Sequence, residues 1–175
     1  MNYKKYALIS VYEKKKILNI CKILNKFNIG IISTGLTSKI IKKGGYNCKT
    51  ISSLTKFKEI LDGRVKTLHP KIYASILYNR KKKSHIKTFN KLNIPKIDFI
   101  IINLYPFKNI IKNSSIFEDC IEMIDIGGST LLRSAAKNYE YITVISSIND
   151  YNIFIKNLKK NNGSTTLKFR ELMAK

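Results

Sequence analysis

The segment from Gly63 to Pro70, Gly-Arg-Val-Lys-Thr-Leu-His-Pro, contains the residue types that most clearly suggest chemistry. Arginine, lysine, threonine and histidine stand close together in it and follow no apolar period. A core strand or an amphipathic helix would instead hold its polar groups on one face. Gly63 and Pro70 bracket the segment and set its backbone choices. This composition favours a loop that reaches for an anion, and a solvated basic loop is the alternative.

Polar residues also stand at the ends of apolar runs elsewhere in the chain. Ser10 and Asn103 each end such a run, and residues 33–35 (Ser-Thr-Gly) end another. Ligands of open parallel sheets bind beyond the carboxyl ends of the strands. One polar residue at a strand end is ordinary capping. Polar residues at several equivalent ends, together with residues 63–70, favour a ligand that carries phosphate.

The elements that must position these residues form an alternating pattern. Short β-branched runs predict strands, and apolar residues at helical spacing predict helices between them. The strand runs are apolar throughout, which is typical of a parallel sheet covered by helices on both faces, so we predict an α/β fold. Thr37 is expected to cap the helix that ends near Lys43. Strands are expected over residues 6–11, 30–33, 48–51, 99–103 and 142–145, and helices over 17–27, 37–43, 71–78, 83–92, 117–123, 129–138 and 150–160, with a further helix over 165–175.

Size and charge limit the function classes. The chain has 175 residues, 44% of them hydrophobic, which suits one domain with a real core. Its net charge of +22 would suit a nucleic-acid partner. However, lysine far outnumbers arginine, and isoleucine and asparagine, which also have AT-rich codons, are abundant, so we infer mutational bias. Because no nucleic-acid recognition motif is present, we expect no such partner and interpret basic runs such as residues 80–83 as solvated faces.

The cysteines and the N-terminus indicate the compartment. Cys21, Cys48 and Cys120 are odd in number and widely spaced, which suits buried thiols in a reducing cytoplasm. The basic N-terminus leads into only a short apolar run without a plausible cleavage site, so we expect no signal peptide. No apolar run approaches the length of a membrane span. A cytoplasmic protein without a membrane partner is therefore predicted.

Several ordered motifs carry a family resemblance. They are Ser10-Val11 with Lys14, Ser33-Thr34-Gly35 with Thr37, residues 62–70, residues 103–107 (Asn-Leu-Tyr-Pro-Phe), residues 124–128 (Ile-Asp-Ile-Gly-Gly) and residues 133–138 (Arg-Ser-Ala-Ala-Lys-Asn). In these motifs the chain resembles the N-terminal, IMP cyclohydrolase domain of the PurH family, whose members combine AICAR formyltransferase and IMP cyclohydrolase activities. The motifs keep the family's order and spacing from about residue 6 to 160, which makes the resemblance specific.

The resemblance implies a fold and a reaction. The fold is methylglyoxal synthase-like, a Rossmann-like parallel sheet, over residues 1–160. The reaction closes the purine ring of 5-formamidoimidazole-4-carboxamide ribotide to give inosine monophosphate (IMP) with loss of water, the last step of de novo purine biosynthesis. The resemblance implies no metal or organic cofactor and a homodimer. The family's formyltransferase domain is missing, so residues 161–175 would be a linker or tail where it would begin. Either the gene is truncated, or a separate AICAR formyltransferase supplies that step.

The chemistry needs a proton acceptor, a cation near the formyl oxygen and a proton donor, because the carboxamide nitrogen must lose a proton as it attacks. By the resemblance, Lys66 polarises the formyl or carboxamide oxygen, and Lys137 donates or accepts a proton. Asp125 and Tyr105 would form a hydrogen-bonded pair that relays the proton. The base would be held by Arg64, Thr67, Asn103, Ile126 and Gly127, and the ribose phosphate by Ser10, Lys14, Ser33, Thr34, Gly35 and Thr37.

Plain structural roles compete with these assignments. Asp125 could merely cap the helix that follows it, and Tyr105 could be an ordinary buried tyrosine with a satisfied hydroxyl. Lys66 and Lys137 are two of many lysines, so either could be solvated. We expect His69 to be hydrogen-bonded within its loop rather than to act as a base.

The chain departs from the family pattern after the first two strands. Residues 12, 13, 15 and 16 replace the usual small and polar residues, and Leu36 stands where a second glycine is usual in the phosphate turn. If residue 36 needs a positive φ, leucine is strained there and phosphate binding is weakened. If φ is negative, Leu36 would pack on a neighbouring helix. The alternative function is therefore a purine-nucleotide-binding remnant of a truncated bifunctional enzyme, impaired in catalysis.

Overall fold

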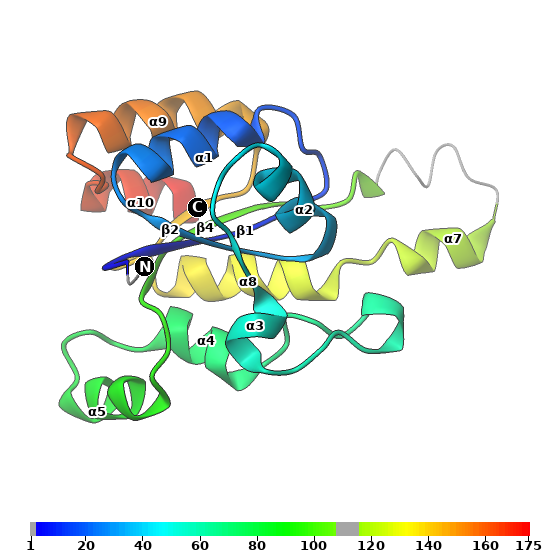
Figure 1. Cartoon of the computed structure of the whole chain (residues 1–175), viewed down its shortest axis with the longest axis horizontal. Helices are drawn as coiled ribbons and strands as arrows, with labels where there is room; N and C mark the ends of the chain where they lie inside the picture. Colours follow the sequence, from blue (N-terminus) through cyan, green and yellow to red (C-terminus); the bar gives the residue numbers. More distant parts are fainter. Residues whose placement is uncertain (1–2, 108–115) are drawn as a thin grey trace.

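The computed structural model describes residues 3–107 and 116–175, and its strands form a single parallel sheet (Figure 1). The strand order is β3-β2-β1-β4-β5, and every neighbouring pair is parallel, as the apolar runs predicted. In β1, Ala7 and Ile9 lie in one apolar cluster and Leu8 in the other, because successive residues point to opposite faces. The strands are β1 (Tyr6–Val11), β2 (Gly30–Ser33), β3 (Lys49–Thr50), β4 (Ile97–Asn103) and β5 (Thr143–Ile145).

Helices cover both faces of the sheet. In Figure 1, α1, α2 and α9 lie on one side of it, and α3, α4, α5 and α8 lie on the other. Ile20 of α1 and Phe154 of α9 are fully buried on the first face, and Ile72 of α4 and Leu131 of α8 are buried on the second. The helices are α1 (Ile17–Lys26), α2 (Gly35–Lys43), α3 (Ile51–Thr55), α4 (Pro70–Leu77), α5 (Lys83–Leu92), α7 (Phe117–Glu122), α8 (Ile126–Lys137), α9 (Tyr151–Lys160) and α10 (Leu167–Ala174), with short 3-10 turns η1 (Leu61–Gly63) and η2 (Ile148–Asp150).

This arrangement places a crevice at the centre of the sheet. The helix after β1 covers one face, whereas α8, which precedes β5, covers the other. The carboxyl ends of β1 and β4 therefore lie where the connections change sides, and open α/β sheets bind their ligands at such a point. Ser10 and Asn103, which the sequence singled out, lie at these two strand ends.

The segment after α9 is packed onto the domain and is not a loose linker. Phe169 of α10 is buried in the first apolar cluster, and Met173 packs against both clusters. The hydroxyls of Thr143 and Thr165 share a buried hydrogen bond of 2.7 Å. Residues 161–175 thus pack as part of this domain.

Candidate active site

The ends of β1 and β2 are joined by a set of buried hydroxyls. Ser33 Oγ donates to the carbonyl of Ile9 at 2.7 Å, and Ser33 is fully buried. The hydroxyls of Ser10 and Thr34 share a hydrogen bond of 2.8 Å. The Thr37 hydroxyl donates to the carbonyl of Val11 at 3.1 Å. We call the group Ser10, Ser33, Thr34, Gly35 and Thr37 the strand half of the site, because these bonds tie it to the sheet.

The strand half ends in the N-terminus of α2. Thr34 is the residue before the helix, and its side chain makes no cap hydrogen bond there. The prediction that Thr37 caps this helix was wrong: Thr37 lies within its first turn and is buried. Gly35 has a φ of 30°, and a Cβ placed on it would meet nothing within 4 Å. The first amides of α2 therefore begin beside open space, and such amides bind anions.

Leu36 is not strained. It is a helical residue of α2, and Gly35, rather than Leu36, takes the positive φ. Its side chain is 66% exposed, so it does not pack on a neighbouring helix either. Both expectations about its side chain are corrected, because the chain needs only one glycine to turn from β2 into α2.

A cavity of about 390 Å³ connects the strand half to the 63–70 loop. Ser33, Thr34 and Gly35 line one part of it, and Lys66 lines another. Gly63 has a φ of 87°, and a Cβ on it would stand 3.7 Å from Lys66 Nζ. The sequence-predicted oxyanion cation and three predicted phosphate-binding residues thus share one hollow. The cavity is also lined by residues that the motifs did not single out, including Ser38, Lys39, Thr50, Phe57, Lys58 and Glu59.

Of these additional residues, Lys39 could have been found from the sequence. It follows Gly35 by four positions on α2, and residues at that spacing share a helix face. Lys58 and Glu59 come from the irregular segment between α3 and η1, for which the sequence gives no positional signal.

The start of α8 brings the second set of predicted residues together. Asp125 Oδ1 accepts a hydrogen bond of 2.6 Å from the backbone N–H of Gly128, so Asp125 caps α8. A Cβ on Gly128 would stand 2.7 Å from Leu104 Cδ2, and one on Gly127 would stand 2.7 Å from Thr67 Oγ1. The two glycines therefore allow α8 to approach the end of β4 and the 63–70 loop closely.

Tyr105 lies next to this point, in the segment after β4. It is half-buried, and its ring centroid is 4.9 Å from that of Tyr12. No hydrogen bond joins Tyr105 to Asp125 among the residues that the structure describes, so the proposed relay pair is not preformed. We call Lys66, Tyr105 and Asp125 the loop half of the site.

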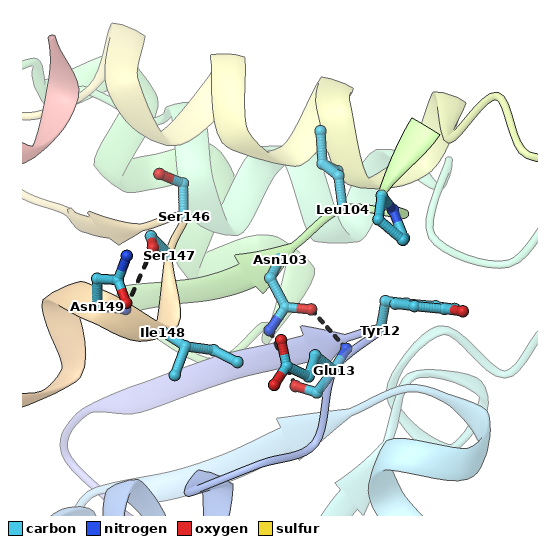
Figure 2. Close-up of a pocket in the computed structure, with 9 residues that line it drawn as sticks. Tyr12, Glu13, Asn103, Leu104, Ser146, Ser147, Ile148 and Asn149 are labelled. Atoms are coloured by element: carbon cyan, nitrogen blue, oxygen red, sulfur yellow. Dashed lines mark hydrogen bonds between the residues drawn. The ribbon is translucent and has the colours of Figure 1, made fainter. Parts of the chain in front are cut away.

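Asn103 holds the loop after β1 against the end of β4. Its Oδ1 accepts from the backbone N–H of Glu13 at 2.8 Å, and its Nδ2 donates to the Glu13 carbonyl at 3.0 Å. Figure 2 shows these contacts beside a second cavity of about 520 Å³, which extends to the segment after β5. The cavity is lined by Tyr12, Glu13, Asn103, Leu104, Pro106, Ser146, Ser147, Ile148 and Asn149.

Three further predicted binding residues line neither of the two cavities. Arg64 forms an exposed ion pair with Glu122 of α7. Ile126 is 61% exposed at the start of α8. The Lys14 ammonium donates to the carbonyls of Val11, at 3.2 Å, and Tyr12, at 2.6 Å. Ligand contacts by these three side chains stay predictions.

Lys137 is not brought to the other predicted residues within one chain. It is the exposed last residue of α8, whereas Asp125 caps the first turn of the same helix. Twelve residues of helix correspond to about 18 Å at 1.5 Å per residue. Because α8 runs antiparallel to the strands, Lys137 lies towards their amino ends. The catalytic role of Lys137 stays a prediction, and within one chain this residue does not lie beside the other predicted catalytic residues.

The histidine of the 63–70 loop and two of the cysteines have structural rather than catalytic surroundings. His69 Nδ1 accepts from the backbone N–H of Lys71 at 3.2 Å and caps α4, as expected for a histidine bonded within its loop. Burial raises the pKa of Cys21 to about 12 and that of Cys48 to about 11, so both thiols are protonated at neutral pH.

Across residues 3–107 and 116–175, no group of three or more His, Cys, Asp or Glu side chains could hold a metal ion. No helix in the same residues is long and apolar enough to cross a membrane.

The chain belongs to the family of MGS-like domains, whose model matches residues 16–130. More particularly, it is similar to part of the bifunctional purine biosynthesis proteins PurH. It is 52% identical over 158 residues to the bifunctional purine biosynthesis protein PurH of Caldicellulosiruptor saccharolyticus, covering 90% of this chain and 31% of that protein. The PurH protein of Clostridium botulinum is 46% identical over 171 residues, covering 98% of this chain and 34% of its own length.

The chain thus spans about a third of the length of these curated relatives. Among solved structures, the crystal structure of ForH superposes with a TM-score of 0.83 at 26% identity, covering 99% of this chain and 90% of ForH. The predicted methylglyoxal synthase-like fold and the family resemblance are confirmed.

Proposed function

We propose that this chain acts in purine biosynthesis as an IMP cyclohydrolase, closing the ring of 5-formamidoimidazole-4-carboxamide ribotide. The observation that supports this most strongly is the 390 Å³ cavity, which combines the start of α2 with the side chain of Lys66. The α2 amides would receive the ribose phosphate, since a helix N-terminus favours an anion. Lys66 would then face the other end of the ribotide.

Ring closure forms one C–N bond and expels water. The carboxamide nitrogen attacks the formyl carbon and loses a proton, while the formyl oxygen gains negative charge. Lys66 stabilises that oxygen by donating a hydrogen bond, and Asp125 or Tyr105 moves the proton. The oxygen takes up the proton that the attacking nitrogen lost. The C–O bond then breaks and the oxygen leaves as water with the proton of the former formamido nitrogen, which forms the C=N bond of the aromatic ring. The Asp125 carboxylate keeps one oxygen, Oδ2, outside its helix-capping bond, so capping and proton transfer are compatible.

The direct test is conversion of the formylated ribotide to IMP by the purified chain, followed by ultraviolet absorbance. We expect turnover without added metal. Binding of IMP without turnover would instead support the second candidate, a purine-nucleotide-binding protein impaired in catalysis.

Lys66→Ala should lose roughly 10²- to 10³-fold in turnover, the usual cost of one oxyanion donor, with an unchanged melting temperature because its side chain is only half-buried. Lys159→Ala, on the exposed side of α9, removes the same charge elsewhere and serves as the control. Near-normal turnover in Lys66→Ala would remove Lys66 from the mechanism.

A further inference from the structure

Tyr12 contacts one of the proposed catalytic residues through its ring. It is 45% exposed in the loop after β1, and its ring lies 4.9 Å from that of Tyr105 at an interplanar angle of 55°. Tilted aromatic pairs at this separation attract each other beyond the area that they bury. In Figure 2 the Tyr12 ring extends away from Ser147, at the end of the cavity that also holds Leu104.

The backbone under Tyr12 is fixed to the strand from which Tyr105 follows. The N–H of Tyr12 donates to the carbonyl of Asn103 at 3.2 Å, and the Asn103 side chain holds both backbone groups of Glu13. Tyr105 comes two residues after Asn103. The two rings are therefore carried by segments whose relative position is set by hydrogen bonds rather than by the ring contact itself.

The Tyr12 ring also lies near the ammonium group of Lys14. Lys14 Nζ lies 5.7 Å from the ring centroid, within cation–π range, and donates to the Tyr12 carbonyl. Tyr105, in contrast, has no side-chain hydrogen bond within the described residues, and its ring meets one aromatic partner. The contact with the Tyr12 ring is therefore the directional interaction that the described residues give the Tyr105 side chain.

We propose that Tyr12 is a positioning residue, which holds the Tyr105 ring so that its hydroxyl faces the reacting end of the ribotide. This inference rests on the proposed cyclohydrolase function. Small displacements of a catalytic group reduce the rate without weakening ground-state binding. Loss of the ring should therefore lower kcat and leave KM and IMP affinity close to normal.

The test compares Tyr12→Ser with Tyr12→Phe, each alone and combined with Tyr105→Phe. Tyr12→Ser should lower kcat roughly 2- to 10-fold, as expected for the loss of one aromatic pair. Tyr12→Phe should keep kcat near that of the unmodified chain, because the ring remains. In the Tyr105→Phe background, Tyr12→Ser should have little further effect, since there is no hydroxyl left to position. A loss of affinity with unchanged kcat, or equal losses in both backgrounds, would overturn the proposal.

A measurement without turnover separates this proposal from the proposed function. The chain has 10 tyrosines and no tryptophan, so ring-labelled tyrosine gives few NMR signals, and Tyr105→Phe identifies that of Tyr105. Tyr12→Ser should shift or broaden this signal, and Tyr12→Phe should leave it near its original position. An unmoved signal refutes the positioning role even if the enzyme is active. A moved signal in an inactive chain refutes only the cyclohydrolase function.

Discussion

The strand half and the loop half of the site are built differently. In the strand half, Ser33, Thr34 and Thr37 are buried, and their hydroxyls bond to neighbouring residues of the sheet or its edge. In the loop half, Lys66 and Tyr105 are half-buried on segments without regular structure. One half is thus fixed by the fold before any ligand binds, whereas the other is held by a few contacts. Substitutions in the strand half should affect stability, and those in the loop half should affect turnover.

The largest expected effect is at Asp125. This residue caps α8 and also belongs to the loop half, so substitutions there can separate an effect on stability from an effect on turnover. Asp125→Asn keeps an oxygen for the Gly128 amide but loses the proton acceptor. Turnover should fall about 10²- to 10⁴-fold, the range for a general acid–base group, with little change in melting temperature. Ultraviolet assays and thermal unfolding measure the two quantities.

Asp125→Ala is the matched control for the capping role. It removes the cap as well, so the free energy of unfolding should also fall by about 1 kcal/mol. If Asp125→Asn retains activity, Asp125 is a structural residue only, and the loop half loses its proton acceptor.

Ser33→Ala should show the opposite behaviour. It deletes a fully buried hydrogen bond to the Ile9 carbonyl, so the free energy of unfolding should fall by about 1 kcal/mol. IMP affinity should fall with it, because the turn into α2 is loosened, while kcat stays within a few-fold. Ser84→Ala, at an exposed position of α5, is the control. A large loss of kcat without a loss of stability would contradict the division into two halves.

The smallest expected effect is at Leu36. Because this residue is already helical and Gly35 carries the positive φ, Leu36→Gly relieves no strain. Glycine should instead weaken α2 by about 0.5–1 kcal/mol through added backbone entropy. Calorimetry with IMP should give equal or slightly weaker binding. Binding that becomes markedly tighter would show that leucine impairs the strand half after all.

The sheet could be predicted well because its signal is local. The bounds of β1 (Tyr6–Val11) and β2 (Gly30–Ser33) agree with the predicted runs over residues 6–11 and 30–33. Helix starts were less accurate: α2 begins at Gly35 and α8 at Ile126, before the expected residues 37 and 129, although Asp125 caps α8 as its plain structural role predicted. Several residue types can cap a helix, and packing decides which one does.

The site could be predicted only in part. Family motifs indicated Lys66 and residues 33–35, which share a cavity, but they also grouped Lys137 with residues about 18 Å away along α8. That helix length alone argues against a shared location in one chain. The contact between Tyr12 and Tyr105 had no sequence signal, because the residues are far apart in the chain and meet only where β1 and β4 pair.

The position of α10 affects whether the β5 edge of the sheet can pair with another chain. β5 is one of the two edge strands of the sheet, and an edge strand offers unpaired backbone groups to another chain. α10 packs against β5, with Phe169 on one side and Met173 touching both apolar clusters. A shortened chain that stops at residue 160 would uncover this edge together with apolar core. Residues 161–175 therefore protect the chain from aggregation, and any fragment prepared for study should include them.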